Sequence, residues 1–530
     1  MDSAKELKSL RLGTEPVGKL IFKMSTPTMI SMLVQGLYNI VDSIFVSNYS
    51  QAGLTALSYA YPMQMLVLAV ALGVGVGVNS LISRRLGEKN YDQATLAAQT
   101  GVFIALCSGV LFAVCGYFIS QGFISLYATG EVYEMGVDYL SICICCSMFP
   151  CVEISMNRAI QATGNTIVPM ISQLLGAATN IIFDPLLIFG IGFPRMGVTG
   201  AAIATVAGQA VAMCTVIVAI VVLRHKLDIR IFFDRTFRLR GKTVKELLTV
   251  GLPAFFLNAI GSIMYLVMNF ILIPFTEVAV NVFGIFYKLQ SIVFMPIFGL
   301  NQGIMPIFGY NYGAGHKDRF MRTLRISMIT AFSMMVIGII IFHTLPVYIL
   351  ELFAVDAATM AMGERALRIA SLCFLPAAIG VIMIAMFNAI GHGTKAMLIS
   401  LLRQLGLLLP FAYLLSHYIG VLGIWASFPI AEVLVVIVFL PVMFATIKKI
   451  FNAKDAEKAS REENLAANDG LCAECAASDT TADTPFGEDY PASTLSELSR
   501  RTEEFLADAS TDEDARNDDA RGADGAANDR

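Results

Sequence analysis

The stretch "ALGVGVGVNSLISRRLGEKNYD", residues 71–92, decides the fold because the chain contains a second version of it 226 residues later. Residues 297–318 read "IFGLNQGIMPIFGYNYGAGHKD", again an apolar run that gives way to a short polar segment. Three glycines and one aspartate keep their places in the two copies: Gly73, Gly77, Gly87 and Asp92 in the first, Gly299, Gly303, Gly313 and Asp318 in the second. The chain therefore contains an internal duplication.

The duplication extends to both sides of this stretch. The further matches are Pro27 with Pro253, Tyr61 with Tyr287, "QATGNT" (161–166) with "NAIGHG" (388–393), and "GVTGAAIA" (197–204) with "GVLGIWAS" (420–427). Glycines that recur four residues apart in apolar helices are typical of close helix packing. We therefore expect Gly73, Gly77 and their counterparts to lie at helix contacts.

The composition identifies an integral membrane protein. Of 530 residues, 56% are hydrophobic and 15% are charged, whereas about 25% are charged in ordinary soluble domains. A bilayer core needs roughly 20 apolar helical residues. Twelve segments qualify: 24–47, 52–83, 94–119, 137–162, 166–190, 198–223, 248–272, 278–309, 323–348, 365–391, 394–416 and 420–447. The predicted fold class is an all-α membrane protein with twelve transmembrane helices in two pseudo-symmetric six-helix bundles.

Lysine and arginine predict the orientation. Residues 224–245 hold eight Lys/Arg, whereas "NYSQAG" (48–53) and "PFTEVA" (274–279) hold none. Basic loops stay in the cytoplasm, so both termini are expected there, in a multi-pass protein of the cytoplasmic membrane. Each half has six spans and both enter from the same side, which makes them parallel repeats about an axis along the membrane normal. The N-terminal sequence lacks the pattern of a cleaved signal peptide, so we interpret the first apolar segment as a span.

The pattern divides the chain into five predicted segments. These are a cytoplasmic N-terminal segment 1–23, an N-terminal lobe 24–223, a basic linker 224–247, a C-terminal lobe 248–447 and an acidic tail 448–530. Residues 451–530 carry 21 Asp/Glu against 8 Lys/Arg, a composition typical of disorder. The tail contains one CxxC pair, Cys472 and Cys475, without the second pair or histidines that a zinc site requires. The other eight cysteines lie in apolar runs and are interpreted as small hydrophobic residues.

Few polar side chains interrupt the predicted spans, and each is a candidate functional residue. They form helical faces at spacings of three and four: Gln35, Asn39 and Asp42 in the first span, Glu153 and Asn157 in the fourth, Asn180 and Asp184 in the fifth, and Thr205 in the sixth. The alternative is that some of them, Gln35 among them, only form interhelical hydrogen bonds, worth about 0.6 kcal/mol each.

Asp42, Asp184 and Thr205 are expected to lie at one depth. Each is six or seven residues from the outer end of its span, roughly 9–10 Å below the surface at a rise of 1.5 Å per residue. Asn180 lies one turn deeper, and Glu153 and Asn157 deeper still. Two carboxylates in a medium of low dielectric share a proton or hold a cation, and oxygen ligands suit Na⁺ or H⁺. The sequence therefore predicts a coupling site for Na⁺ or H⁺.

Proline occurs in the first and the fifth predicted spans, which carry Asp42 and Asp184. Pro185 follows Asp184 and cannot continue the hydrogen-bond ladder, so it frees the carbonyl of Ile181 and bends the helix. We expect ion binding to bend the first and fifth spans at Pro27 and Pro185 and so to expel a substrate.

The C-terminal half does not repeat these acids. Met268 stands where Asp42 would fall, and this half instead carries Lys288 in its second span, Arg403 in its fifth and Glu432 in its sixth. Lys288 and Arg403 are expected either to pair with Glu432 or to extend toward the membrane surface. The ion chemistry is therefore assigned to the first half.

The motifs together resemble those of the multidrug and toxic compound extrusion (MATE) family, specifically its DinF- or MepA-like bacterial branches. The residues that carry the resemblance are "NIVDSIFVS" (39–47), "SRRLGEKNYDQA" (83–94), "QATGNT" (161–166), "NIIFDPLLIFG" (180–190), "GVTGAAIAT" (197–205), "FGYNYGAGHKDRF" (308–320) and "GVLGIWAS" (420–427). The resemblance covers about residues 15–450.

The resemblance implies a secondary active antiporter of the cell membrane that exports amphipathic, often cationic compounds in exchange for Na⁺ or H⁺, by alternating access of two lobes. It places the cation site on Asp42, Asn180, Asp184 and Thr205, with Glu153 or Asn157 nearby. We expect no cofactor, no nucleic-acid partner, contact with membrane lipids, and a monomer.

Three alternatives are considered. A lipid-linked oligosaccharide flippase of the same superfamily would need a more cationic cavity than Lys288 and Arg403 provide. A membrane prenyltransferase would need clustered acids such as DDxxD to hold magnesium diphosphate, and the spans contain none. A non-transporting scaffold that recruits partners through the acidic tail remains open.

Overall fold

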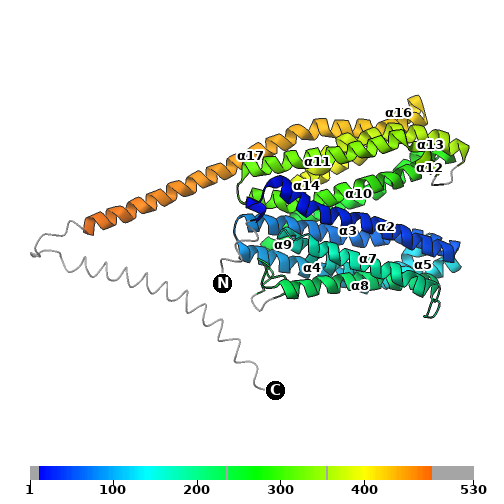
Figure 1. Ribbon diagram of the computed structural model, residues 1–530, viewed down its shortest axis with the longest axis horizontal. Helices are drawn as coiled ribbons and strands as arrows, with labels where there is room; N and C mark the ends of the chain where they lie inside the picture. The colour runs from blue at the N-terminus through cyan, green and yellow to red at the C-terminus, as the bar shows by residue number, and fades with distance from the viewer. Residues whose placement is uncertain (1–10, 234–236, 352, 354–355, 480–530) are drawn as a thin grey trace, which may run out of the picture. The chain divides into compact units, whose positions relative to one another are not determined.

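The computed structural model describes residues 11–233, 237–351, 353 and 356–479. Residues 1–455 belong to one compact unit and residues 456–530 to another, and each is described by itself. The side chains of residues 39, 457, 458 and 461–479 lie outside the described set. Within the first unit, Figure 1 shows long helices that run side by side in two layers.

The N-half, residues 17–223, contains seven helices. They are α2 (Val17–Tyr49), α3 (Gln51–Gly87), α4 (Tyr91–Ile124), α5 (Glu131–Cys145), α6 (Met148–Ala162), α7 (Ile167–Ile188) and α8 (Gly197–Leu223). The C-half, residues 241–455, contains α9 (Gly241–Leu272), α10 (Glu277–Gly313), α11 (Lys317–Thr344), α12 (Pro346–Glu351), α13 (Ala357–Ala370), α14 (Phe374–Ala389), α15 (Gly393–Leu401), α16 (Leu409–Ile419) and the first part of α17 (Val421–Asp479). A 3₁₀ turn, η1 (Ser371–Cys373), joins α13 to α14, and a π-helical turn, η2 (Leu402–Leu408), joins α15 to α16.

The number of apolar spans agrees with the predicted twelve. Eleven of the described helices, or runs of helices, are long and apolar enough to cross a membrane, and the pair α5 and α6 makes a twelfth if it counts as one span. This pair bends by 42° at its break, within the segment predicted as the span 137–162. The sequence predicted bends at Pro27 and Pro185 and none at this break. Pro27 lies inside α2 and Pro185 inside α7, and both helices are continuous.

Helix α17 runs further than the sequence analysis predicted. It continues to Asp479, so the first part of the predicted unstructured tail is helical. Residues 452–468 read "NAKDAEKASREENLAAN", and alanine, lysine, glutamate and arginine all favour helix. The side chains of Cys472 and Cys475 and all of residues 480–530 lie outside the described residues.

The two halves begin their second helices in the same way. The hydroxyl of Ser50 accepts a hydrogen bond from the backbone N–H of Gly53 at 3.3 Å and caps α3. Thr276, 226 residues later, caps α10 by accepting from the N–H of Ala279 at 3.1 Å. An N-cap of this kind satisfies one of the unpaired N–H groups of a helix. The duplication thus extends to the local chemistry that starts the helices.

Glycines bring the two halves together, as predicted. A Cβ atom at Gly77 of α3 would lie 2.5 Å from the carbonyl oxygen of Leu247 in α9, and one at Gly303 of α10 would lie 2.6 Å from the Cα of Ser25 in α2. The second helix of each half therefore packs on the first helix of the other. The predicted packing role of these glycines is confirmed.

These contacts gather at one end of the unit, here called the basic end. It is where α3 and α10 end and α9 begins, and it carries Arg84 and Arg85. There the guanidinium of Arg85 lies 2.6 Å from the carboxylate of Glu246 in α9. The hydroxyl of Ser80 donates to the carbonyl of Asn388 in α14 at 2.5 Å. The two halves are thus held together at the basic end.

Candidate functional site

The predicted residues of the fifth and sixth spans lie next to each other. The side-chain amide of Asn180 lies 3.4 Å from both the Asp184 carboxylate and the Thr205 hydroxyl, donating to each. Asn180 and Asp184 are buried, whereas Thr205 is partly exposed. Helices α7 and α8 approach this closely because Gly208 has no side chain; a Cβ there would lie 2.7 Å from the carbonyl oxygen of Gly176.

Asp42 joins this group from α2. Its carboxylate interacts electrostatically with that of Asp184, and a tyrosine lies near both: Tyr38 interacts with Asp42, Asp184 and also Glu153. Tyr38 is one helical turn before Asp42 on the same helix, so the two side chains share one face of α2. Asp42, Asn180, Asp184 and Thr205 are hereafter called the carboxylate cluster.

Three buried oxygens in the carboxylate cluster have no hydrogen-bond partner. They are Oδ1 of Asp42, Oδ1 of Asn180 and Oδ2 of Asp184. A buried acceptor without a donor costs about 1–3 kcal/mol, and more when it is charged. A bound cation or proton removes this cost, so the arrangement can take up and release a positive charge.

Tyrosine and glutamine extend the cluster toward α3 and α5. The phenol of Tyr139 accepts a hydrogen bond from the amide of Gln64 at 3.3 Å. A further side-chain hydrogen bond joins Tyr139 and Thr205, and Tyr139 also interacts electrostatically with Asp42.

Glu153 and Asn157 form a second polar group, nearer the basic end. The amide of Asn157 donates a short hydrogen bond to the Glu153 carboxylate, and the Ser172 hydroxyl donates to it at 3.1 Å. Arg158 is buried and interacts electrostatically with Glu153, while its guanidinium donates to Gln161 at 3.0 Å. Glu153 therefore accepts two hydrogen bonds and lies near a cation, whereas the Asp184 carboxylate accepts one hydrogen bond, from Asn180.

The remaining predicted residues of α2 are less connected. Gln35 is half-buried, and the side chain of Asn39 lies outside the described residues. Pro27 is half-buried and precedes Thr28, whose hydroxyl donates to the Gly299 carbonyl of α10 at 2.7 Å. Pro185 is half-buried beside Asp184.

Five residues at these two groups were not predicted: Tyr38, Gln64, Tyr139, Arg158 and Ser172. Tyr38 could have been found because it lies four residues before Asp42. Arg158 could have been found as a charge inside a span. Gln64, Tyr139 and Ser172 carry no such signal, because their roles depend on which way α3, α5 and α7 face.

The C-half has different chemistry at the matching places. Met268, the counterpart of Asp42, is fully buried in the apolar core. Arg403 and Glu432 lie 3.4 Å apart and form an ion pair, whereas Lys288 is exposed. Arg403 therefore forms the ion pair with Glu432 that was one expectation for these cations. Lys288 forms no such pair with the described residues.

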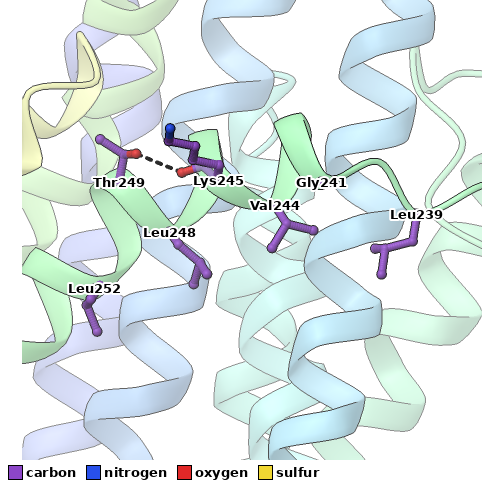
Figure 2. Close-up of a pocket in the computed structure, with 7 residues that line it drawn as sticks. All are labelled: Leu239, Gly241, Val244, Lys245, Leu248, Thr249 and Leu252. Carbon is purple, nitrogen blue, oxygen red and sulfur yellow. Dashed lines mark hydrogen bonds between the residues drawn. The ribbon is translucent and has the colours of Figure 1, made fainter.

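Two cavities lie away from the carboxylate cluster. A cavity of about 640 Å³ runs along the start of α9, where Figure 2 shows Leu248 and Leu252 beside Thr249, whose hydroxyl bonds the Lys245 carbonyl. A cavity of about 220 Å³ at the basic end is lined by Arg11, Glu15, Lys23 and Lys226, among others. Neither shares a residue with the carboxylate cluster. Among the described residues, no group of three or more His, Cys, Asp or Glu side chains is placed to hold a metal ion.

Comparison with known proteins places this geometry among transporters. The family model MatE matches residues 27–186 and 253–414. A FAD transporter of Shewanella oneidensis is 29% identical over 425 residues, which are 79% of this chain and 92% of that protein. The multidrug export protein MepA of Staphylococcus haemolyticus is 25% identical over 416 residues, 78% and 90% of the two chains.

A solved structure gives the same fold. A transporter of the MOP superfamily from Pyrococcus furiosus, whose binding pocket is described as having reverse polarity, superposes with a TM-score of 0.79 at 26% identity. The match covers 84% of this chain and 98% of that one. The predicted all-α membrane architecture of two pseudo-symmetric six-helix bundles is confirmed.

Proposed function

The chain belongs to the MatE family of multidrug and toxic compound efflux transporters, and from that membership we propose that it is a secondary antiporter. It is a transporter and not an enzyme. It exports amphipathic, often cationic compounds, and it takes up Na⁺ or H⁺ at the carboxylate cluster in exchange. No cofactor takes part.

One observation carries this proposal. The three unpartnered oxygens of Asp42, Asn180 and Asp184 belong to two carboxylates and an amide, and the Thr205 hydroxyl lies 3.4 Å from the Asn180 amide. Oxygen atoms of these kinds bind hard cations such as Na⁺, and two close carboxylates also share a proton. Either ion supplies the positive charge that the cluster lacks.

Alternating access follows from the contacts between the halves. The halves meet at the basic end through Gly77 and Gly303 and through the Arg85–Glu246 pair. Basic loops stay in the cytoplasm, so we assign this end, and both termini, to the cytoplasmic face of the cell membrane. The closed cytoplasmic end supports access to the carboxylate cluster from outside. Ion binding then bends α2 and α7 at Pro27 and Pro185 and opens the basic end.

The exposed side chains of the helices indicate what surrounds the transporter. Many large apolar side chains of the helices are exposed, Leu111, Phe118 and Leu266 among them. We propose that they contact membrane lipids and that the chain acts as a monomer.

Efflux of ethidium from vesicles tests the coupling. Proteoliposomes that contain the wild-type chain, with a pH gradient and a sodium gradient imposed separately, should show efflux driven by at least one of them. Asp184→Asn should lose that dependence, because one of the two carboxylates becomes neutral. Asp138→Asn is the matched control, since Asp138 is an exposed acid of α5. Unchanged ion dependence in Asp184→Asn would defeat the proposal.

A second substrate class is favoured by the relative from Shewanella. That protein is a FAD transporter, and 92% of its length aligns with this chain. Export of a flavin dinucleotide is therefore the second candidate. The oligosaccharide flippase is less favoured, because Glu432 already pairs with Arg403 and Lys288 is exposed.

A further inference from the structure

The ion pair of the C-half is incomplete. A single contact of 3.4 Å joins Nη1 of Arg403 to Oε1 of Glu432. Nε of Arg403 and Oε2 of Glu432 are buried and have no hydrogen-bond partner. A buried charge pair offsets its desolvation cost only if its remaining donors and acceptors are satisfied. The guanidinium therefore has an unused donor, and its planar edge fits a second oxygen.

Arg403 lies where the helix is irregular. It belongs to the π-helical turn Leu402–Leu408, which interrupts the span Gly393–Ile419. The neighbouring Gln404 donates to the Ser400 hydroxyl at 3.0 Å. Single π turns within α-helices occur frequently at functional sites. Here the turn carries both Arg403 and Gln404.

Two glycines lie near this site, one beside Glu432 and one beside Gln404. A Cβ at Gly380 of α14 would lie 3.9 Å from Oε2 of Glu432. A Cβ at Gly261 of α9 would lie 3.8 Å from the Gln404 carbonyl oxygen and 4.0 Å from the Tyr287 hydroxyl. The side chains of Arg403 and Glu432 remain 17% and 13% exposed. The pair is therefore partly exposed, although Nε of Arg403 and Oε2 of Glu432 are themselves buried.

Tyr287 connects the pair to the boundary between the halves. It interacts electrostatically with Arg403 and also with Tyr61 of α3, its counterpart in the duplication. Tyr61 in turn interacts with Tyr38 beside the carboxylate cluster. Tyr287, Tyr61 and Tyr38, on α10, α3 and α2, are therefore polar side chains within electrostatic range of one another.

We propose that Arg403 is a substrate-binding residue that receives a phosphate or carboxylate group of the exported compound, and that Glu432 occupies its place while no substrate is bound. The inference rests on the proposed export function and names a substrate class for it, amphiphiles that carry an anionic group. Arginine suits this role because its planar edge bonds two oxygens of a phosphate or carboxylate at once. The substrate anion competes with Glu432, so the charge of Arg403 is neutralised in both states.

Two flavins that differ by one phosphate test this site. Binding of flavin mononucleotide and of riboflavin to the purified full-length protein is measured by quenching of flavin fluorescence. The wild type should prefer the mononucleotide by about tenfold, the ratio expected of a charge-assisted hydrogen bond. Arg403→Gln should remove the preference, and Glu432→Gln should increase it because the competing carboxylate is gone. Lys288→Gln is the matched control and should retain it.

If the Arg403–Glu432 pair only stabilises the fold, the variants are expected to behave differently. The double variant Arg403→Gln/Glu432→Gln removes both charges and leaves no unpaired ion, so it should melt near the wild type and still lack the preference. A wild type that binds both flavins equally, or an Arg403→Gln variant that melts like the wild type and keeps the preference, overturns the inference. Ethidium efflux by Asp184→Asn is independent of these measurements, so the failure of ion coupling is distinguishable from the failure of this site.

Discussion

The side-chain amide of Asn180 lies 3.4 Å from the carboxylate of Asp184, one helical turn away on α7, and donates a hydrogen bond to it. The same amide reaches Thr205 of α8, so Asn180 links the two helices that carry three of the four residues of the carboxylate cluster. Its own carbonyl oxygen is buried and unpartnered. Asn180 thus supports Asp184, and we propose that its carbonyl oxygen is also a ligand for the coupling ion.

Replacement of Asn180 should weaken ion coupling without unfolding the chain. Asn180→Ala removes one ligand oxygen and the donor to Asp184, so the concentration of Na⁺ or H⁺ that gives half-maximal efflux should rise about tenfold, the equivalent of about 1.4 kcal/mol. Efflux rates measured against ion concentration check this. Thr179→Ala is the control, because Thr179 bonds only the backbone of its own helix. An unchanged half-maximal concentration in Asn180→Ala would contradict the assignment.

The hydroxyl of Tyr139, and not its ring, should affect the ion affinity of the carboxylate cluster. Tyr139→Phe keeps the ring but removes the hydrogen bonds to Gln64 and Thr205. A net hydrogen bond is worth about 1 kcal/mol, so a loss of roughly fivefold in apparent ion affinity is expected, with little change in melting temperature. Tyr117→Phe, at an exposed tyrosine of α4, should behave like the wild type. Equal effects of the two substitutions would remove Tyr139 from the site.

Gly77 should be required for closure of the basic end. A methyl group at this position meets the Leu247 carbonyl oxygen at 2.5 Å, so Gly77→Ala should separate α3 from α9 and cost about 1–3 kcal/mol, as overpacking does. The measurement is the melting temperature of the purified protein together with ethidium efflux. Gly122→Ala is the matched control, because a Cβ there has nothing within 4 Å. A variant at Gly77 as stable and active as that control would show that the halves do not need this contact.

The basic end should weaken in acid through His392. This residue lies in the connection between α14 and α15, where burial, and then the charges of Lys395 and Arg84, lower the pKa of its imidazole below the ordinary value. The folded protein thus holds His392 neutral, while the unfolded chain takes up a proton near pH 6.5. The contribution to stability is complete above that pH and falls as the pH decreases through it.

Melting temperatures at pH 7.5 and pH 5.5 check this expectation. The wild type should lose more stability over this interval than His392→Gln, which cannot be protonated. His225→Gln, at an exposed position of the basic end, should follow the wild type. A loss in His392→Gln as large as that of the wild type would rule out this source of acid sensitivity.

The repeat and the spans could be read from the sequence because their signals are local. Apolar length marks a span, and the match of Ser50 with Thr276 or of Gly77 with Gly303 appears at a constant offset. The contacts of Gly73 and Gly77 were predicted correctly because a glycine in an apolar helix has few other uses. The bend between α5 and α6 was not predicted, although "CICCSMFP" (143–150) contains two signals of a helix start, Ser147 at the N-cap of α6 and Pro150 in its first turn.

The pairs Asn180/Asp184 and Glu153/Asn157 were evident from the sequence, because residues four apart share one face of a helix whatever surrounds it. That Tyr139 meets Gln64 and Thr205, that Glu153 lies near Arg158, and that Arg403 pairs with Glu432 depended on how each helix turns about its own axis. This rotation is set by packing between helices that are distant in the chain, and in a membrane both sides of a helix are apolar, so periodicity alone does not determine it. The sequence by itself determined which helices exist and which carry charge; only the tertiary structure decided which charges meet.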